Sequence, residues 1–205
     1  MTAEEIRRLK ASFMARKIQV VCFDTLAEAK AYLLDAIPQG STVGIGHSAT
    51  LQKMHITLSL MDKGMLVYDK ELASSKEESK AIKKRALLAD CYITGANAVS
   101  MDGRIVSVDH SGNRVAAMAY GPDKVFVVVG INKITDTWEE AIKRVKNIAS
   151  PMNASRAGYH PPCVMAGHCV DCTSGERVCN MLSIIEGQAD PNRMTLCIVK
   201  EAWGF

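Results

Sequence analysis

Residues 124–129 read KVFVVV, and this stretch is the strongest strand signal in the chain. β-Branched and aromatic side chains favour strands, and their uninterrupted run means that both faces of the strand are buried. Strands buried on both faces belong to parallel sheets, which crossover helices cover on either side. The stretch therefore predicts a strand of an α/β protein.

The sequence on either side of this run repeats the same alternation of strand and helix. Short β-rich runs that predict further strands lie at residues 18–23, 42–46, 65–68, 91–94 and 195–199. Amphipathic spacing or capping-box pairs predict the intervening helices at residues 6–14, 25–37, 48–63, 75–89 and 137–148. The prediction is a Rossmann-like α/β fold, with a largely parallel sheet and helices on both faces.

Two segments depart from this alternation. Residues 102–109, DGRIVSVD, combine Asp-Gly with period-two alternation and predict a small antiparallel excursion. After residue 150 the chain becomes rich in Pro, Asn and Ser, and a cysteine-bearing segment follows. We therefore predict an α/β core over residues 1–150. Residues 151–205 would be a Cys-rich C-terminal extension that returns to the core with a final strand.

Composition limits the classes of function. The 205 residues are 48% hydrophobic, which is enough for a full core and compatible with a homodimer. The net charge of +3, without long basic runs, gives no footprint for nucleic acid. No apolar run is long enough to span a membrane, and the charged start MTAEEIRRLK is unlike a secretory signal. These features predict a cytoplasmic protein.

The first candidate site is the turn GIGHS at residues 44–48. Gly44 and Gly46 close a predicted strand, and a predicted helix begins at Ser48. Such a turn directs backbone N–H groups at an anion above the carboxyl end of the strand, and His47 could donate to the same anion. The pattern lacks the third glycine of a dinucleotide fingerprint and the lysine of a P-loop. A tight turn without function remains an equal alternative.

The second candidate site is the polar stretch between two predicted strands, residues 94–122. Its density of Asn, Asp, His, Ser and Gly is typical of a ligand-binding loop. Arg114 could clamp a carboxylate or phosphate, and Asp109 could orient the ligand or act as a general base. Ordinary turns with solvated side chains are the alternative. The candidate ligand-binding residues are Asn97, Asp102, Asn113 and Arg114, with Asp109 and Arg114 as candidate catalytic residues.

The third candidate site contains four of the seven cysteines, in the spacing C-x5-C-x2-C-x6-C. The central C-x2-C is a common chelating turn, so an iron–sulfur cluster or a zinc ion is one interpretation. A redox dithiol and inert thiols are the others, because clustered cysteines in a reducing compartment rarely form structural disulfides. The candidate metal ligands are Cys163, Cys169, Cys172 and Cys179, with His160 and His168 as possible substitutes.

Several of these stretches together resemble one family. GIGHSATL, TGANAVSMDGRIVSVDHSGNRVAA, VVVGINKI and GHCVDCTSGERVCN are similar to sequences of the LUD-domain family, named for lactate utilization. The resemblance covers residues 1–205 and is closest to the single-domain, lactate utilization protein C type. It implies a NagB/RpiA/CoA-transferase-like fold, whose members bind sugar phosphates, acyl groups or CoA above the carboxyl ends of their strands.

The resemblance also implies a function. Family members associated with lactate work beside iron–sulfur proteins in the oxidation of lactate to pyruvate. We therefore expect an auxiliary or subunit of 2-hydroxy-acid oxidation that binds a small anionic ligand, relays electrons through a cysteine-bound iron–sulfur cluster and contacts redox partner proteins. No Glu lies between Glu78 and Glu139, so the glutamate chemistry of CoA-transferases is not expected.

Two other functions remain open. One is a small-molecule enzyme acting on a phosphorylated sugar or an acyl compound, with a structural zinc in the extension. The other is a regulatory or scaffolding module without chemistry of its own. Whether the protein is an enzyme is therefore not decided by the sequence.

Overall fold

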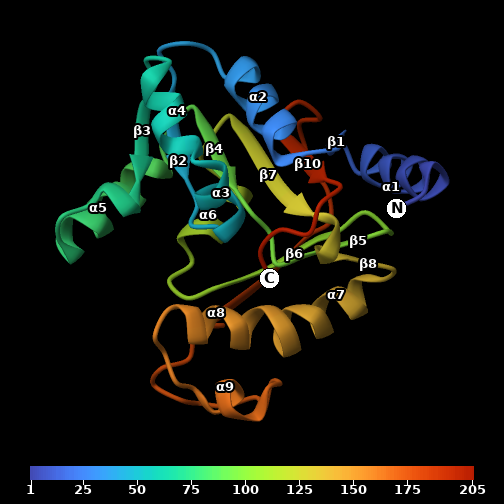
Figure 1. Ribbon diagram of the computed structural model, residues 1–205, viewed down its shortest axis with the longest axis vertical. Coiled ribbons are helices and arrows are strands. Elements are labelled where there is room, and N and C mark those ends of the chain that lie inside the picture. The colour runs from blue at the N-terminus through green and yellow to red at the C-terminus, as the bar shows by residue number, and fades with distance from the viewer.

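A six-stranded parallel sheet forms the centre of the molecule (Figure 1). The computed structural model describes all residues, 1–205. Every neighbouring pair in this sheet is parallel. The predicted parallel sheet is therefore confirmed. Its strands, in spatial order, are β1 (Gln19–Phe23), β10 (Met194–Val199), β7 (Lys124–Gly130), β4 (Cys91–Thr94), β2 (Thr42–Ile45) and β3 (Leu66–Asp69).

Strand β7 contributes to the cores on both faces of the sheet. Val125, Val127 and Val129 pack into one core, together with helix residues such as Phe13. Phe126 and Val128 pack into the other. Successive side chains of a strand point to opposite faces, so an unbroken apolar run can serve both cores at once. Residues 124–129 are therefore continuously apolar after Lys124 because helices cover the sheet on both faces.

Helices cover both faces, as predicted. Three predicted capping residues, Thr25, Ser75 and Thr137, accept a backbone N–H from the residue three positions later. These bonds satisfy backbone donors that a helix start otherwise leaves unpaired. The helices that contribute to one core are α1 (Ala3–Ala15), α5 (Lys76–Ala86) and α6 (Asn113–Ala119). Those on the other are α2 (Leu26–Ala36), α3 (Ala49–Met54) and α4 (Ile56–Asp62).

The single helix predicted over residues 48–63 is wrong, because the structure divides it into α3 and α4. His55 lies between them with a φ of 50°, in the left-handed region. A helix cannot pass through a residue in that conformation, so the chain changes direction there. Nothing in the local sequence marks the break, since His55 stands where a glycine would have signalled it.

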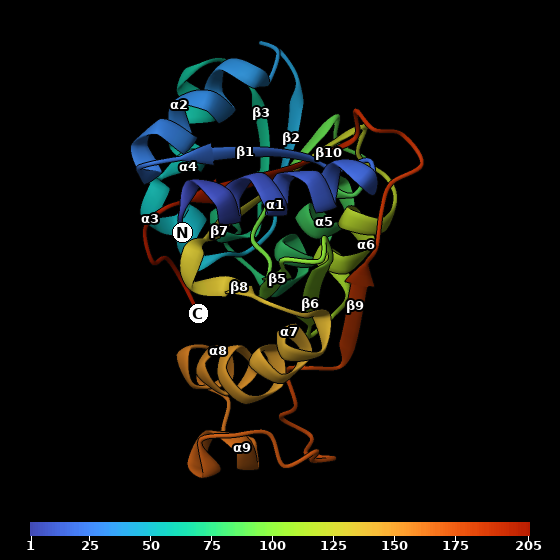
Figure 2. The same cartoon turned by 90° about the vertical axis from the view of Figure 1, so that its right-hand side faces the viewer.

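A second, four-stranded sheet lies below the first in the view of Figure 2. Its hairpin confirms the predicted antiparallel excursion. Ala98 pairs with Val106 in the antiparallel pair β5–β6. Helix α7 (Trp138–Arg144) packs on this sheet through Ala141. The strands, in spatial order, are β8 (Ile134–Thr135), β5 (Ala98–Ser100), β6 (Ile105–Asp109) and β9 (Met181–Ile185).

The segment that follows α7 continues without interruption. A π-helical turn (Val145–Ala149) joins α7 to α8 (Ser150–Arg156), so the boundary predicted at residue 150 falls inside a continuous helical run. Helix α9 (Pro162–Ala166) lies farthest from the six-stranded sheet (Figure 2). The chain then returns through β9 to β10, between β1 and β7. None of the helices combines the length and apolar character needed to cross a bilayer.

Candidate functional site

A cavity of about 260 Å³ lies where the strands of the parallel sheet end. Segments that follow β2, β3, β4, β7 and β10 line it, together with Lys83 of α5 and with the end of β6 and the loop after it. Parallel strands share one carboxyl edge, which is where ligands bind in open α/β sheets. Helix α8 supplies part of the lining through Asn153 and Arg156. The cavity is therefore a cleft, partly open to solvent, between the sheet edge and the segment after β7.

The lining of this cavity is strongly basic. It contains five cationic residues and only one carboxylate, Asp109. A cleft with such an imbalance attracts negative charge, because its protein walls concentrate the field of the cations. The cationic residues are Lys70, Lys83, Arg114, Lys133 and Arg156.

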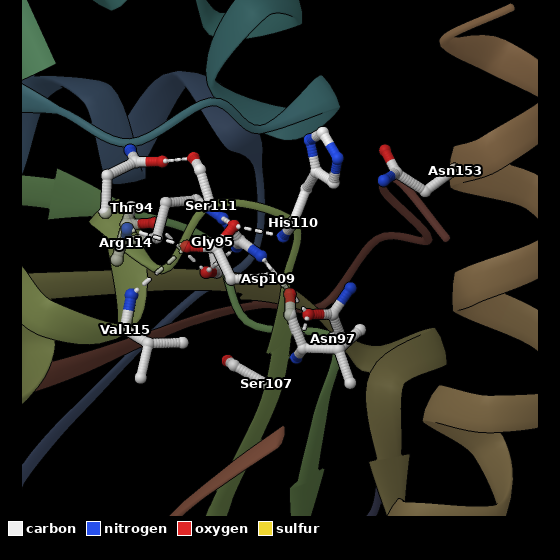
Figure 3. A network of polar contacts seen from close by, with 12 residues as sticks. Thr94, Gly95, Asn97, Ser107, Asp109, His110, Ser111, Arg114, Val115 and Asn153 are labelled. Atoms are coloured by element: carbon white, nitrogen blue, oxygen red, sulfur yellow. Dashed lines mark hydrogen bonds and ion pairs between the residues drawn. The ribbon is translucent and has the colours of Figure 1, made fainter. Parts of the chain in front are cut away.

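Asp109 and Arg114 form an ion pair, with Arg114 Nε 3.4 Å from Asp109 Oδ1. The guanidinium also donates from Nη1 to the carbonyl of Gly95, at 3.2 Å, and from Nη2 to that of Val108, at 2.6 Å. Figure 3 shows these groups converging beside Asn97. Most N–H groups of Arg114 are thus bonded to protein oxygens, and the side chain braces the loop that follows β6.

The carboxylate of Asp109 has a second structural role. Its Oδ2 accepts the backbone N–H of Arg114 at 2.8 Å and that of Val115 at 3.4 Å. These donors belong to the first turn of α6, whose capping position is Gly112 and offers no side chain. Asp109 therefore caps α6 from outside the helix, which fixes the loop between β6 and α6.

His47, in the turn after β2, is half-buried. Its Nδ1 lies 3.0 Å from Glu71 Oε1, while its Nε2 is buried without a partner. Burial, followed by the charges of Lys70 and Arg156, lowers the pKa of His47 from 6.5 to about 4. The imidazole is therefore neutral at pH 7. Because a carboxylate only accepts, Nδ1 carries the proton and Nε2 is a free acceptor.

Lys133 is the most buried cation of the lining, with 4% of its surface exposed. It ends the 3-10 turn Ile131–Lys133 that follows β7, and its Nζ donates to the carbonyl of Ala96 at 3.1 Å. Burial, with the charges of Arg144 and Arg114, lowers the pKa of Lys133 from 10.5 to about 7. The amine of Lys133 therefore loses its proton far more readily than that of an ordinary lysine.

The structure brings together most of the residues predicted from the two polar stretches. His47, Ser48, Asn97, Asp109, Asn113 and Arg114 all line the cavity.

Three predicted ligand-binding residues lie elsewhere. Asp102 belongs to the turn between β5 and β6, where its carboxylate pairs with Arg104 Nη1 at 2.7 Å. Gly44 and Gly46 are needed for packing: a Cβ on Gly44 would lie 2.7 Å from the Tyr92 ring. These positions serve the fold and do not line the cavity.

The four candidate metal ligands lie apart from the cavity, in and after α9. Cys163 is buried within α9, and the other three are half-buried in the irregular segment that follows. The backbone N–H of Asp171 donates to Cys169 Sγ at 3.4 Å. Arg177 donates to the carbonyls of Cys172, at 2.6 Å, and Cys179, at 3.3 Å. These bonds order the segment around its thiols.

The fit of this segment to a metal can be judged from its donors. All seven cysteines are free thiols, and no group of three His, Cys, Asp or Glu side chains is gathered closely enough to hold a metal ion. Cys169, Cys172 and Cys179 nevertheless lie near enough to Cys163 to raise the pKa of its thiol. An iron–sulfur cluster and a zinc ion both remain predictions from the spacing of the cysteines.

Sequence reasoning missed several lining residues, of which Lys133 is the most informative. It follows the strongest predicted strand by four positions, at the sheet edge where ligands bind. That position could have identified Lys133 as a candidate binding residue from the sequence. The sequence holds no comparable signal for Arg156 and Tyr159, because they reach the cavity only through the path of α8.

Fold and site define a Rossmann-like α/β protein with a basic cavity at the carboxyl edge of its sheet. The chain matches the model of the LUD domain over residues 6–199, and it belongs to the LUD-domain family. It is similar to the crystal structure of a DUF162 family protein from Deinococcus radiodurans. That similarity has 18% identity and a TM-score of 0.56, and covers 96% of this chain and 97% of that chain.

Weaker similarities extend to other proteins. Ribose 5 phosphate isomerase A from Neisseria gonorrhoeae is 18% identical, with a TM-score of 0.37 over 55% of this chain and 56% of that chain. The eIF2B beta subunit from Chaetomium thermophilum is 15% identical, with a TM-score of 0.37 over 55% of this chain and 43% of that chain. No curated protein matches the chain.

Proposed function

We propose that this protein binds a small carboxylate or phosphate compound in the cavity at the carboxyl edge of the parallel sheet. The observation that carries the proposal is the basic lining, in which Lys70, Lys83, Arg114 and Arg156 outnumber the single carboxylate of the lining. That carboxylate, Asp109, is already paired with Arg114. Lys70 is paired as well, because its Nζ lies 3.2 Å from Glu71 Oε1. Lys83 and Arg156 are the charged residues of the lining without a carboxylate partner, so an anionic ligand would supply their counter-ion.

The other polar groups of the cavity narrow the class of ligand. His47 Nε2 is an acceptor without a partner, and it lies near the charges of Lys70 and Arg156. A compound with a hydroxyl group beside its anionic group could donate to Nε2 while the cations hold its oxygens. Hydroxy acids and sugar phosphates both have this pattern, and the volume of about 260 Å³ suits a small metabolite.

We propose further that the ligand is a 2-hydroxy acid or its oxidation product, bound by an auxiliary or subunit of a lactate-oxidising system. Membership of the LUD-domain family supports this role through the family's association with lactate.

Calorimetric titration with L-lactate, pyruvate and inorganic phosphate tests the proposal. Arg156→Ala removes a cation of the lining, and binding should weaken about tenfold, the usual cost of a charge-assisted hydrogen bond. Arg8→Ala, an exposed arginine of α1, is the matched control and should leave the affinity unchanged.

The titrations also separate the alternatives. Binding of phosphate alone would favour a sugar phosphate over a 2-hydroxy acid. Absence of binding for all three anions, or equal weakening in the two arginine variants, would contradict an anion site in this cavity.

A further inference from the structure

Lys133 lines the cavity with an amino group that the fold leaves largely unpaired. Its side chain is 96% buried, yet Nζ has one hydrogen-bond partner, the carbonyl of Ala96. No carboxylate lies within ion-pair distance of Nζ, and the charges that act on it are those of Arg144 and Arg114. A buried lysine without a counter-ion is costly to keep charged, so the neutral amine is favoured.

A second buried group beside Lys133 lacks a partner. Thr50 is fully buried, and its Oγ1 makes no hydrogen bond. Nζ of Lys133 and Oγ1 of Thr50 both lie 3.1 Å from the point that a Cβ on Gly204 would occupy. Buried polar atoms without partners are rare in native proteins, and each calls for an explanation. A bound ligand that completes the hydrogen bonding is one such explanation.

The segment after β10 covers both groups. Gly204 has a φ of 67°, and its carbonyl accepts from Asn132 Nδ2 at 2.9 Å. Asn132 Oδ1 accepts the backbone N–H of Trp203 at 3.0 Å, which ties the segment to the turn that carries Lys133. The amine is thereby kept away from bulk water while it still lines the cavity, the environment in which a lysine acts as a nucleophile.

We propose that Lys133 is a catalytic amine, and that its Nζ forms a reversible imine with the carbonyl carbon of an anionic carbonyl compound such as a 2-oxo acid. This proposal rests on the anion site proposed above, whose cations would hold the carboxylate while the carbonyl group reaches Nζ. It adds a reacting group to what could otherwise be a binding site only.

The step balances without an oxidant or a reductant. The lone pair of the neutral Nζ attacks the carbonyl carbon, and the C–N bond forms as the carbonyl π pair moves to oxygen. The two protons of the amine leave with that oxygen as water, and the nitrogen lone pair closes the C=N bond.

The test is reductive trapping in the intact protein. Pyruvate or glyoxylate is added at pH 7 with sodium borohydride, and the modified lysine is identified by peptide mass spectrometry. Lys133 should be labelled at least about tenfold more than any other lysine, because ordinary lysines carry about a thousandfold less neutral amine at this pH. L-Lactate, which has no carbonyl group to attack, should give no adduct.

Two variants control the assignment. Lys133→Met should abolish the adduct, and Lys80→Met, which removes an exposed lysine of α5 outside the lining, should leave Lys133 as the labelled residue. If Lys133→Met fails to fold, peptide mapping of the labelled protein without substitutions still identifies the lysine that forms the adduct. Labelling spread over surface lysines would overturn the proposal.

Calorimetry on the same samples separates the two proposals. Pyruvate that binds without an adduct at Lys133 would overturn the imine and leave the anion site standing. An absence of both binding and adduct would overturn both.

Discussion

Asp109 and Arg114 show how a residue can be placed correctly and still have a different role from the one predicted. Both line the cavity, as their loop suggested. Their oxygens and nitrogens, however, are used to cap α6 and to hold the carbonyls of Gly95 and Val108. Sequence could not predict this, because the acceptors for Arg114 come from the end of β4 and from β6. The pair therefore builds the wall of the site.

A substitution at this pair should reduce stability. Arg114→Met leaves the carboxylate of Asp109 buried without its partner, and we expect unfolding to become easier by about 3 kcal/mol, as for other broken buried pairs. Urea denaturation measures the change. Arg8→Met on α1 is the control, with an expected change within about 0.5 kcal/mol. Lost anion binding at unchanged stability would instead make Arg114 the ligand clamp predicted from sequence.

At the scale of elements, the sequence predicts regular structure well and its interruptions poorly. Strands such as β7 and caps such as Thr25 follow from local patterns, and each was found where expected. The break at His55 and the insertion of β10 between β1 and β7 depend on contacts between distant segments. Periodicity carries no signal for such contacts.

The break between α3 and α4 gives a second prediction. His55 has a φ of 50°, which costs a residue with a Cβ about 1 kcal/mol relative to glycine. His55→Gly should therefore raise the melting temperature by about 2–4 °C in a chain of this size. Lys53→Gly, inside α3, is the matched control and should lower it. A lower melting temperature for both variants would show that the histidine side chain matters more than the backbone conformation.

The cysteine segment gives a third prediction. Cys169, Cys172 and Cys179 are half-buried, whereas Cys163 is buried and the pKa of its thiol is raised by burial and by the neighbouring cysteines. Alkylation of the folded protein at pH 7 should therefore modify the first three before Cys163. Mass spectrometry over time gives the order of modification. Early loss of Cys163 would contradict this account of the segment.

The same labelling tests the metal interpretation of these cysteines. A bound iron–sulfur cluster or zinc ion would protect all four thiols, since coordinated sulfur reacts slowly. Protein reconstituted with iron and sulfide, or with zinc, is compared with the metal-free sample. Equal rates in all samples would leave a redox dithiol or inert thiols.

At the scale of the whole molecule, one edge of the parallel sheet collects residues from distant parts of the chain. The sequence predicted this edge and the polar loops that reach it. It did not predict Lys133, because a lysine after a strand looks the same whether solvent or the segment around Gly204 covers it. Burial of that lysine depends on residues about seventy positions away, which only the folded chain brings together.

The buried site also makes the stability of the molecule depend on pH. In the unfolded chain His47 binds a proton as the pH falls below about 6.5, whereas in the folded protein it stays neutral until about 4. The free energy of unfolding should therefore decrease as the pH falls from 6.5 to about 4, whereas above pH 6.5 the contribution of His47 to stability is fully present. Urea denaturation of His47→Gln should show a shallower decrease. His168→Gln, at an exposed position, should keep the original slope.

Crystals soaked in selenate give the most direct test of the basic cavity, because selenium can be located by its anomalous scattering. We expect a selenate ion inside the cavity, with oxygens near Arg156 and Lys133. Selenate bound only on the outer surface, with the cavity filled by water at high soak concentration, would contradict the claim that this edge of the sheet is an anion site.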